Sequence, residues 1–173
     1  MVEDIVLPKA YSLRYAYKND DAFVFSLFCS ARTELSLLPL PPQQRELLVQ
    51  QQYRLQQASY AAQYPQAVTL IIEYQSISIG KIILNPSVNG VHIVNPSVNG
   101  VHIVDFVIAP QFRGYGYGSV ILDSVKAYAQ AKEASVSLSV DRQNMRAKQL
   151  YLRLGFLPFE ISPTQEWLSW PSP

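Results

Sequence analysis

The sequence predicts an α/β (α+β) fold, in which about four helices lie against a mixed sheet of about six to seven strands. Two observations predict it. Short segments rich in β-forming residues recur along the chain, and segments with apolar residues at helical spacing separate them, in the order β-α-α-β-β-β-α-β-α-β-β. With 173 residues the chain is long enough for one buried core, so we expect a single domain over residues 1–173.

The first third of the chain predicts a strand followed by two helices. Residues 11–17 alternate and are rich in β-formers. Residues 19–21, Asn-Asp-Asp, offer N-cap oxygens for a helix through residue 35, and the prolines of LPLPP at 38–42 end it. A second helix is expected from about residue 42 to residue 64. The apolar residues near one of its faces are Leu48, Leu55, Ala58 and Ala62.

The remaining elements follow from the same two periodicities. Residues 67–75 and 76–84 predict a hairpin, and residues 101–109 predict another strand. A helix opens after residues 110–119, with Ile121, Leu122, Val125, Tyr128 and Ala129 at helical spacing. A strand at 134–140, a short helix at about 147–154 that ends at Gly155, and closing strands at 156–162 and 165–170 complete the order.

Composition excludes several classes of protein. There are 14 basic and 13 acidic side chains, so the charge balance does not indicate a basic surface that binds polyanions, and we expect no nucleic-acid partner. No apolar run approaches the roughly 20 residues that span a bilayer, and the first residues lack a signal-peptide pattern, so we expect no membrane contact and a cytoplasmic location. Cys29 is the only cysteine, and the two histidines, His92 and His102, occupy the same position of a repeated phrase, so no metal site is predicted.

The stretch RGYGYGS, residues 113–119, is the most informative motif. Alternating glycines between a strand and a helix permit a sharp turn and leave backbone N–H groups near the positive end of the helix dipole, which is a cup for phosphate oxygens. A P-loop would require a lysine, and none occurs here before Lys126. The dinucleotide fingerprint would require glycine or alanine in place of Ser119. A nucleotide-binding protein of either type is therefore disfavoured.

The pattern Arg113-x-x-Gly116-x-Gly118 resembles the signature R/Q-x-x-G-x-G/A of the GNAT acetyltransferases. The resemblance continues through SLSVDRQNMRAKQLYLRLGF, residues 137–156, and covers about residues 101–160. The matching residues of this second segment are Asn144, Ala147, Leu150, Tyr151, Gly155 and Phe156. Two motifs in the right order and spacing are more specific than one glycine motif. The resemblance implies a mostly antiparallel GNAT-like sheet and an acetyl-CoA-dependent N-acetyltransferase.

The resemblance also implies which residues bind acetyl-coenzyme A. Pantetheine would pair like an extra strand with Phe106, Val107 and Ile108, whose backbone would polarise the thioester carbonyl. Asn144 matches a position that contacts the cofactor, although it also suits an N-cap. The residues expected around the pyrophosphate are Arg113, Gly114, Tyr115, Gly116, Tyr117, Gly118 and Ser119.

Tyr151 is the expected general acid, because it occupies the family's tyrosine position and a phenol with a pKa of about 10 stays protonated at neutral pH. The alternative is a ring that only packs against the sheet. Asp105 is our candidate for the general base, and His102, Glu34 and Glu73 are further candidates. Asp105 and His102 lie on opposite faces of an ideal strand unless a bulge intervenes. Relatives that accept an already neutral amine need no dedicated base.

A ten-residue phrase, NPSVNGVHIV, occurs twice without a difference, at 85–94 and 95–104. We interpret it as a tandem duplication. Because ten is even, either copy would keep the alternation of a strand, and we expect the copy joined to residues 105–110 to enter the sheet. Residues 85–100 would then form an enlarged connection with Val91 to Val94 as an arm. That arm suggests a homodimer through residues 85–104.

The acceptor remains open between a small-molecule amine, a protein N-terminus or lysine, and an antibiotic. The alternative function is a non-catalytic module with the same fold that binds acyl-CoA or assembles through the repeat. Thiol release on adding amines separates the two.

Overall fold

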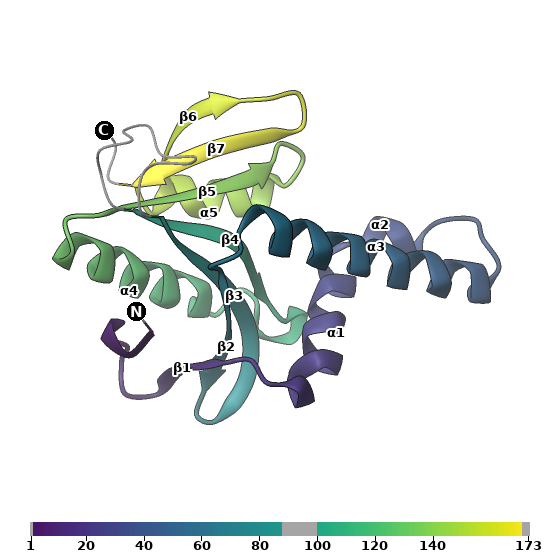
Figure 1. Cartoon of the computed structure of the whole chain (residues 1–173), viewed down its shortest axis with the longest axis horizontal. Helices are drawn as coiled ribbons and strands as arrows, with labels where there is room; N and C mark the ends of the chain where they lie inside the picture. The colour runs from purple at the N-terminus through teal and green to yellow at the C-terminus, as the bar shows by residue number, and fades with distance from the viewer. Residues whose placement is uncertain (1, 88–99, 171–173) are drawn as a thin grey trace.

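A computed structural model of the chain describes residues 2–87 and 100–170, which contain one seven-stranded sheet (Figure 1). The strands are β1 (Tyr11–Tyr15), β2 (Val68–Tyr74), β3 (Ile77–Ser87), β4 (Gly100–Ile108), β5 (Ser135–Asp141), β6 (Leu157–Ile161) and β7 (Gln165–Trp170). The α-helices are α1 (Asp21–Ala31), α2 (Thr33–Ser36), α3 (Pro42–Gln63), α4 (Tyr117–Ala131) and α5 (Met145–Arg153). Short 3₁₀ turns are η1 (Val2–Asp4), η2 (Lys18–Asp20) and η3 (Pro110–Phe112).

The strands lie in the order β1-β2-β3-β4-β5-β7-β6. The neighbours β4 and β5 are parallel, and the other neighbouring pairs are antiparallel. A parallel pair requires a crossover, which α4 supplies between these two strands. The expected mixed, mostly antiparallel sheet is confirmed. The described residues form five α-helices where about four were expected, because residues 21–36 form two helices instead of one.

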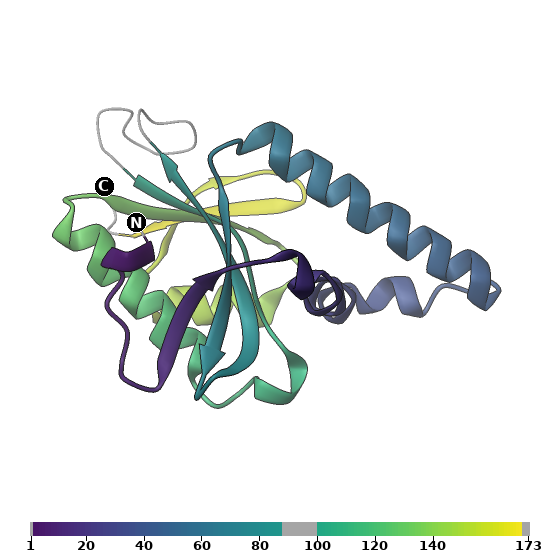
Figure 2. The ribbon, with the colours of Figure 1, turned by 60° about the horizontal axis from the view of Figure 1, so that its bottom comes forward.

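Helices cover both faces of the central strands (Figures 1 and 2). On one face, α4 buries Ile121, Leu122 and Val125, as their spacing predicted, in one cluster with apolar residues of the strands. On the other face, Leu27 of α1 packs with Val107 of β4. None of the helices in the described part of the chain is long and apolar enough to cross a membrane.

Helix α3 packs through a different face from the one that its apolar residues predicted. Leu55 is 56% exposed, and Ala58 and Ala62 are exposed as well. The inward face carries tyrosines. Tyr53 contacts two phenylalanine rings of α1, and Tyr64, which follows the helix, stacks on the imidazole ring of His102 in β4. Of the four apolar residues predicted near one face, Leu48 is half-buried and the other three are exposed. The tyrosines decide the orientation, because an aromatic ring buries far more apolar surface than an alanine.

The second copy of the ten-residue phrase supplies part of β4. Residues 101–103 pair with both β3 and β5, which confirms that the copy joined to residues 105–110 enters the sheet. The expectation that all of residues 85–100 form a connection is wrong at both ends. Strand β3 continues through Ser87, whose backbone pairs with Gly100, because β4 offers ladder partners that far. Val91 to Val94, the expected arm, lie outside the described residues.

Candidate functional site

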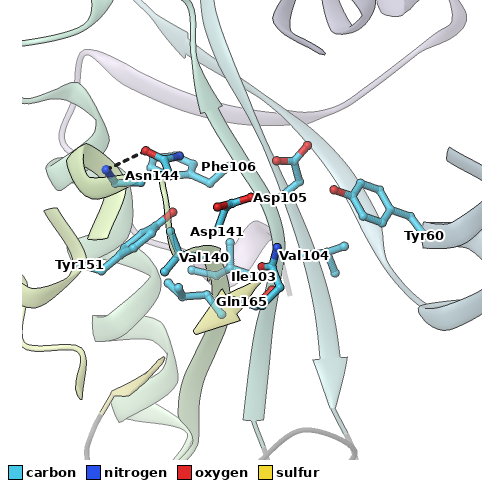
Figure 3. Close-up of a pocket in the computed structure, with 13 residues that line it drawn as sticks. Tyr60, Ile103, Val104, Asp105, Phe106, Val140, Asp141, Asn144, Tyr151 and Gln165 are labelled. Atoms are coloured by element: carbon cyan, nitrogen blue, oxygen red, sulfur yellow. Dashed lines mark hydrogen bonds between the residues drawn. The ribbon is translucent and has the colours of Figure 1, made fainter. Parts of the chain in front are cut away.

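The parallel strands β4 and β5 pair along only part of their length. Residues 100–103 pair with residues 135–138, and beyond this ladder the strands separate (Figure 1). A pocket of about 180 Å³ lies at the opening (Figure 3). Its lining comes from α3, β4, β5, α5, β7 and the β5–α5 turn: Tyr60, Ile103, Val104, Asp105, Phe106, Leu138, Ser139, Val140, Asp141, Asn144, Ala147, Tyr151 and Gln165. Four predicted site residues, Asp105, Phe106, Asn144 and Tyr151, therefore meet here.

A β-bulge on β4 decides which way Asp105 points. Ile103 and Asp105 pair with neighbouring residues of β3, so Val104 between them is an extra residue. The bulge places His102 and Asp105 on the same face of the sheet, whereas their odd separation would place them on opposite faces of an ideal strand. The bulge that could place these two residues on one face is therefore present in β4.

Asp105 lies between a lysine of β3 and a tyrosine of α3. Lys81 Nζ is 2.8 Å from Asp105 Oδ2, and the exposed fractions of the two side chains are 1% and 21%. The two side chains form an ion pair. Tyr60 directs its hydroxyl toward Asp105 (Figure 3). Burial raises the pKa of Tyr60, and the negative charge of Asp105 adds to this rise.

Tyr151 projects into the pocket from α5, on the opposite side from Tyr60 (Figure 3). It is 7% exposed, and its ring meets Phe156 edge-on with the ring centroids 5.8 Å apart. Burial raises the pKa of Tyr151 above its ordinary value, and the charge of Asp105 acts in the same direction. The phenol therefore stays protonated at neutral pH. The ring packs in the core while the side chain also lines the pocket, so the two interpretations of this residue are compatible.

Asn144 both caps a helix and lines the pocket. Its Oδ1 accepts a hydrogen bond from the backbone N–H of Ala147 at 3.2 Å, which satisfies one of the free donors at the start of α5. The expected N-cap is confirmed. Next to it, Asp141 Oδ1 accepts from the backbone N–H of Gln143 at 2.8 Å, which fixes the turn between β5 and α5.

The glycine turn lies at the N-terminus of α4, outside the pocket lining. Gly114 and Gly116 have φ of +88° and +85°, values that favour glycine, and Gly116 is the N-cap of α4. A Cβ added to either glycine would meet no atom within 4 Å, so the turn borders open space. A Cβ on Gly118 would lie 3.4 Å from the ring of Phe106, which shows how closely α4 begins beside β4.

The side chain of Arg113 braces this turn against the rest of the molecule. Its Nε donates to the backbone oxygen of Ile108 at 2.7 Å, and its Nη2 donates to Ser30 Oγ of α1 at 3.1 Å. Burial lowers the pKa of Arg113, and the positive charge of Arg146 adds to this lowering. The guanidinium thus ties the end of β4 to α1.

Residues 34–156 match the family described as Acetyltransferase (GNAT) family. The chain belongs to this family. No curated protein matches the sequence.

Solved structures share the fold at low sequence identity. The PaiA N-acetyltransferase from Thermoplasma acidophilum, in complex with coenzyme A, is 15% identical with a TM-score of 0.63, over 92% of this chain and 97% of that chain. Naa50 from Arabidopsis thaliana, in complex with the bisubstrate analogue CoA-Ac-MVNAL, is 17% identical with a TM-score of 0.57 over the same shares. An acetyltransferase from Thermus thermophilus is 16% identical with a TM-score of 0.64, over 97% of this chain and 99% of that chain.

Two carboxylates considered as the base in this GNAT chain lie outside the pocket lining. Glu73 of β2 accepts from Arg14 Nε at 2.7 Å and from Ser12 Oγ at 2.9 Å. Glu34 of α2 is exposed, and its Oε1 lies 3.7 Å from a guanidinium nitrogen of Arg32. Among the base candidates, Asp105 is the one that lines the pocket.

His102 is buried and does not line the pocket. Its ring stacks between Tyr64 and Trp167, with centroid separations of 5.2 and 5.6 Å. Its Nδ1 lies 2.9 Å from Ser137 Oγ on the neighbouring strand. These contacts join the residue that follows α3 to β4, β5 and β7, where β4 and β5 still pair.

Residues at or beside the candidate site that the sequence did not predict include Tyr60, Lys81, Asp141 and Gln165. A signal existed for the first, because Tyr53, Tyr60 and Tyr64 are spaced i, i+7, i+11 and share one helix face. A signal also existed for Lys81, the one charged residue in the β-rich run SISIGKIIL. We find no sequence signal that marks the other two.

Proposed function

We propose that this chain transfers an acetyl group from acetyl-coenzyme A to the nitrogen of a small-molecule or peptide amine. One observation carries the proposal. The opening between β4 and β5 brings together a buried phenol, Tyr151, and a carboxylate, Asp105, beside a glycine turn that borders open space. Membership of the GNAT family and the coenzyme A complexes named for two of the structural neighbours support the same donor.

The glycine turn suits the diphosphate of coenzyme A. The first N–H groups of α4 lack partners within the helix and lie at its positive end, where an anion is stabilised. The open space beyond Gly114 and Gly116 leaves room for phosphate oxygens. Arg113 and Arg146 add positive charge nearby. Residues 113–119 and Asn144 would hold this end of the donor.

The far half of β4 suits the pantetheine arm. Val107 and Ile108 pair with β3 along one edge, while their other edge faces the opening. In an antiparallel pair, alternate residues turn their N–H and C=O groups away from the partner strand. Polar backbone groups at residues 106–108 thus face the opening, where an N–H stabilises charge that develops on a carbonyl oxygen.

Acetyl-coenzyme A would supply the acetyl group as a thioester. The lone pair of the amine nitrogen forms the C–N bond, and the C–S bond breaks with its electron pair on sulfur. Tyr151 donates its proton to the sulfur, and Asp105 accepts the proton that the nitrogen loses. Proton exchange with solvent then restores both side chains. The raised pKa of Tyr151 keeps the acid form available.

A thiol-release assay tests the proposal. The purified chain is mixed with acetyl-coenzyme A and a panel of amines, and the free thiol is measured, for the unaltered chain, Tyr151→Phe and the surface control Ile161→Ala. We expect amine-dependent release that falls about 100-fold or more in Tyr151→Phe, a loss typical of a removed general acid, and stays unchanged in the control. Binding of coenzyme A without release with any amine would overturn the proposal in favour of a binding module.

A further inference from the structure

The acceptor side of the pocket carries a carboxylate whose charge is already compensated. Lys81 is 1% exposed, and its Nζ lies 2.8 Å from Asp105 Oδ2. A buried lysine cation is strongly destabilised without a partner, so the two charges must be treated as one unit. To an approaching ammonium group this unit presents no net charge.

The other groups that face this unit do not supply the missing negative charge. Tyr60 of α3 and Tyr151 of α5 are kept neutral by their burial. The second carboxylate of the lining, Asp141 of β5, is exposed and accepts a backbone hydrogen bond, so water screens its charge. Within the described part of the chain, the pocket is therefore a poor site for an alkylammonium ion.

We propose that the acceptor is a weakly basic amine, such as the α-amine of a peptide or amino acid, and that the Lys81–Asp105 ion pair sets this preference. The inference rests on the proposed acetyl transfer. Only the neutral amine has the lone pair that attacks. An α-amine has a pKa of about 7.9 and a lysine side chain one of about 10.4, so the neutral fraction at pH 7 differs by about 300-fold.

Lys81 acts through Asp105 and does not line the pocket. It is therefore a positioning residue whose charge compensates that of Asp105, so that the pair does not attract an ammonium ion. Without that charge, Asp105 becomes an unpaired carboxylate at the opening, which attracts an alkylammonium ion and can take its proton. Lys81→Met keeps the length of the side chain and removes the charge, whereas Lys81→Arg keeps the charge.

The test compares two peptides of one sequence. One has a free α-amine and an acetylated lysine side chain, and the other has an acetylated α-amine and a free lysine. We expect the unaltered chain to favour the free α-amine in kcat/KM by tenfold or more at pH 7. Lys81→Met should reduce this ratio at least tenfold, and Lys81→Arg should retain it. A preference for the free lysine, or an unchanged ratio in Lys81→Met, would overturn the inference.

A second measurement on the unaltered chain covers the case in which Lys81→Met does not fold. A series of primary amines of similar size but different pKa is compared at pH 7. We expect kcat/KM to fall as the amine pKa rises, and a rise would overturn the inference. No thiol release with any amine would instead count against acetyl transfer itself, so the two failures are distinguishable.

Discussion

Gly80→Ala tests whether the end of β4 is held in place by its close approach to β3. Gly80 pairs with Ile108, and a Cβ added to it would lie 2.4 Å from the backbone oxygen of Val107 and 3.1 Å from the Cα of Ile108. Ordinary contact begins near 3.4 Å, so the strand must move by about 1 Å. The nearest of these atoms is a backbone oxygen, which cannot turn aside like the Cδ1 atom of Ile108, a side-chain atom that would lie at 3.0 Å. The strand that must move carries residues 106–108 of the proposed donor site.

Overpacking of this kind costs about 1–3 kcal/mol of unfolding free energy. With an m-value of about 2 kcal/mol per M, the slope of the unfolding free energy against urea concentration, the unfolding midpoint should fall by about 0.5–1.5 M. Urea titration followed by circular dichroism measures the midpoint, and calorimetry with coenzyme A measures the effect on the site. We expect the affinity for coenzyme A to fall at least threefold, because the displaced backbone no longer matches the ligand.

The control is Ser78→Ala, a change two residues earlier on the same strand. It removes one oxygen and adds no atom, so its unfolding free energy should stay within about 0.5 kcal/mol of that of the unaltered chain. If Gly80→Ala unfolds at the same urea concentration as the control and binds coenzyme A equally well, the strands tolerate the extra methyl group. The proposed dependence of the donor site on this contact would then be refuted.

Three further predictions concern the other walls of the site. Asn144→Ala removes the N-cap of α5 and should cost about 1 kcal/mol in the urea titration, and an unchanged midpoint would contradict the cap. Gly116→Ala forces a φ of +85° on alanine, at a cost of about 1 kcal/mol, and its methyl group enters the space proposed for phosphate. Its affinity for coenzyme A should fall at least tenfold by calorimetry, and equal affinity would place the diphosphate elsewhere. Because the pKa of Tyr151 is raised, thiol release should show no loss from phenol ionisation as the pH rises from 7 to 10. A fall in kcat centred near pH 8 would exclude this phenol as the acid.

Local sequence patterns were sufficient to predict most of the fold, because the spacing of apolar residues indicates which face of a helix or strand is buried. The spacing of Ile121, Leu122 and Val125 predicted the buried face of α4, and these residues are fully buried. Gly155, expected just after α5, has a φ of +84°, as a helix C-terminus requires. In each case the residue type and its spacing determine the local structure without help from distant parts of the chain.

The prediction failed where distant segments decide the outcome. The face of α3 depends on how large tyrosine rings pack against α1 and the sheet, and a count of alanines and leucines does not contain that information. The bulge at Val104 depends on the register between β3 and β4, so the common face of His102 and Asp105 was not predictable. The pairing of Lys81 with Asp105 depends on the same register. These are the features that shape the acceptor side of the candidate site.

The most direct test of the central claim is calorimetric titration of the unaltered chain with coenzyme A and, separately, with pantetheine. This measurement requires no knowledge of the acceptor. We expect a micromolar Kd for coenzyme A and at least 100-fold weaker binding of pantetheine, because pantetheine lacks the diphosphate proposed for the glycine turn. No measurable binding of coenzyme A, or equal binding of the two ligands, would contradict the claim that this turn and the opening between β4 and β5 form a coenzyme A site.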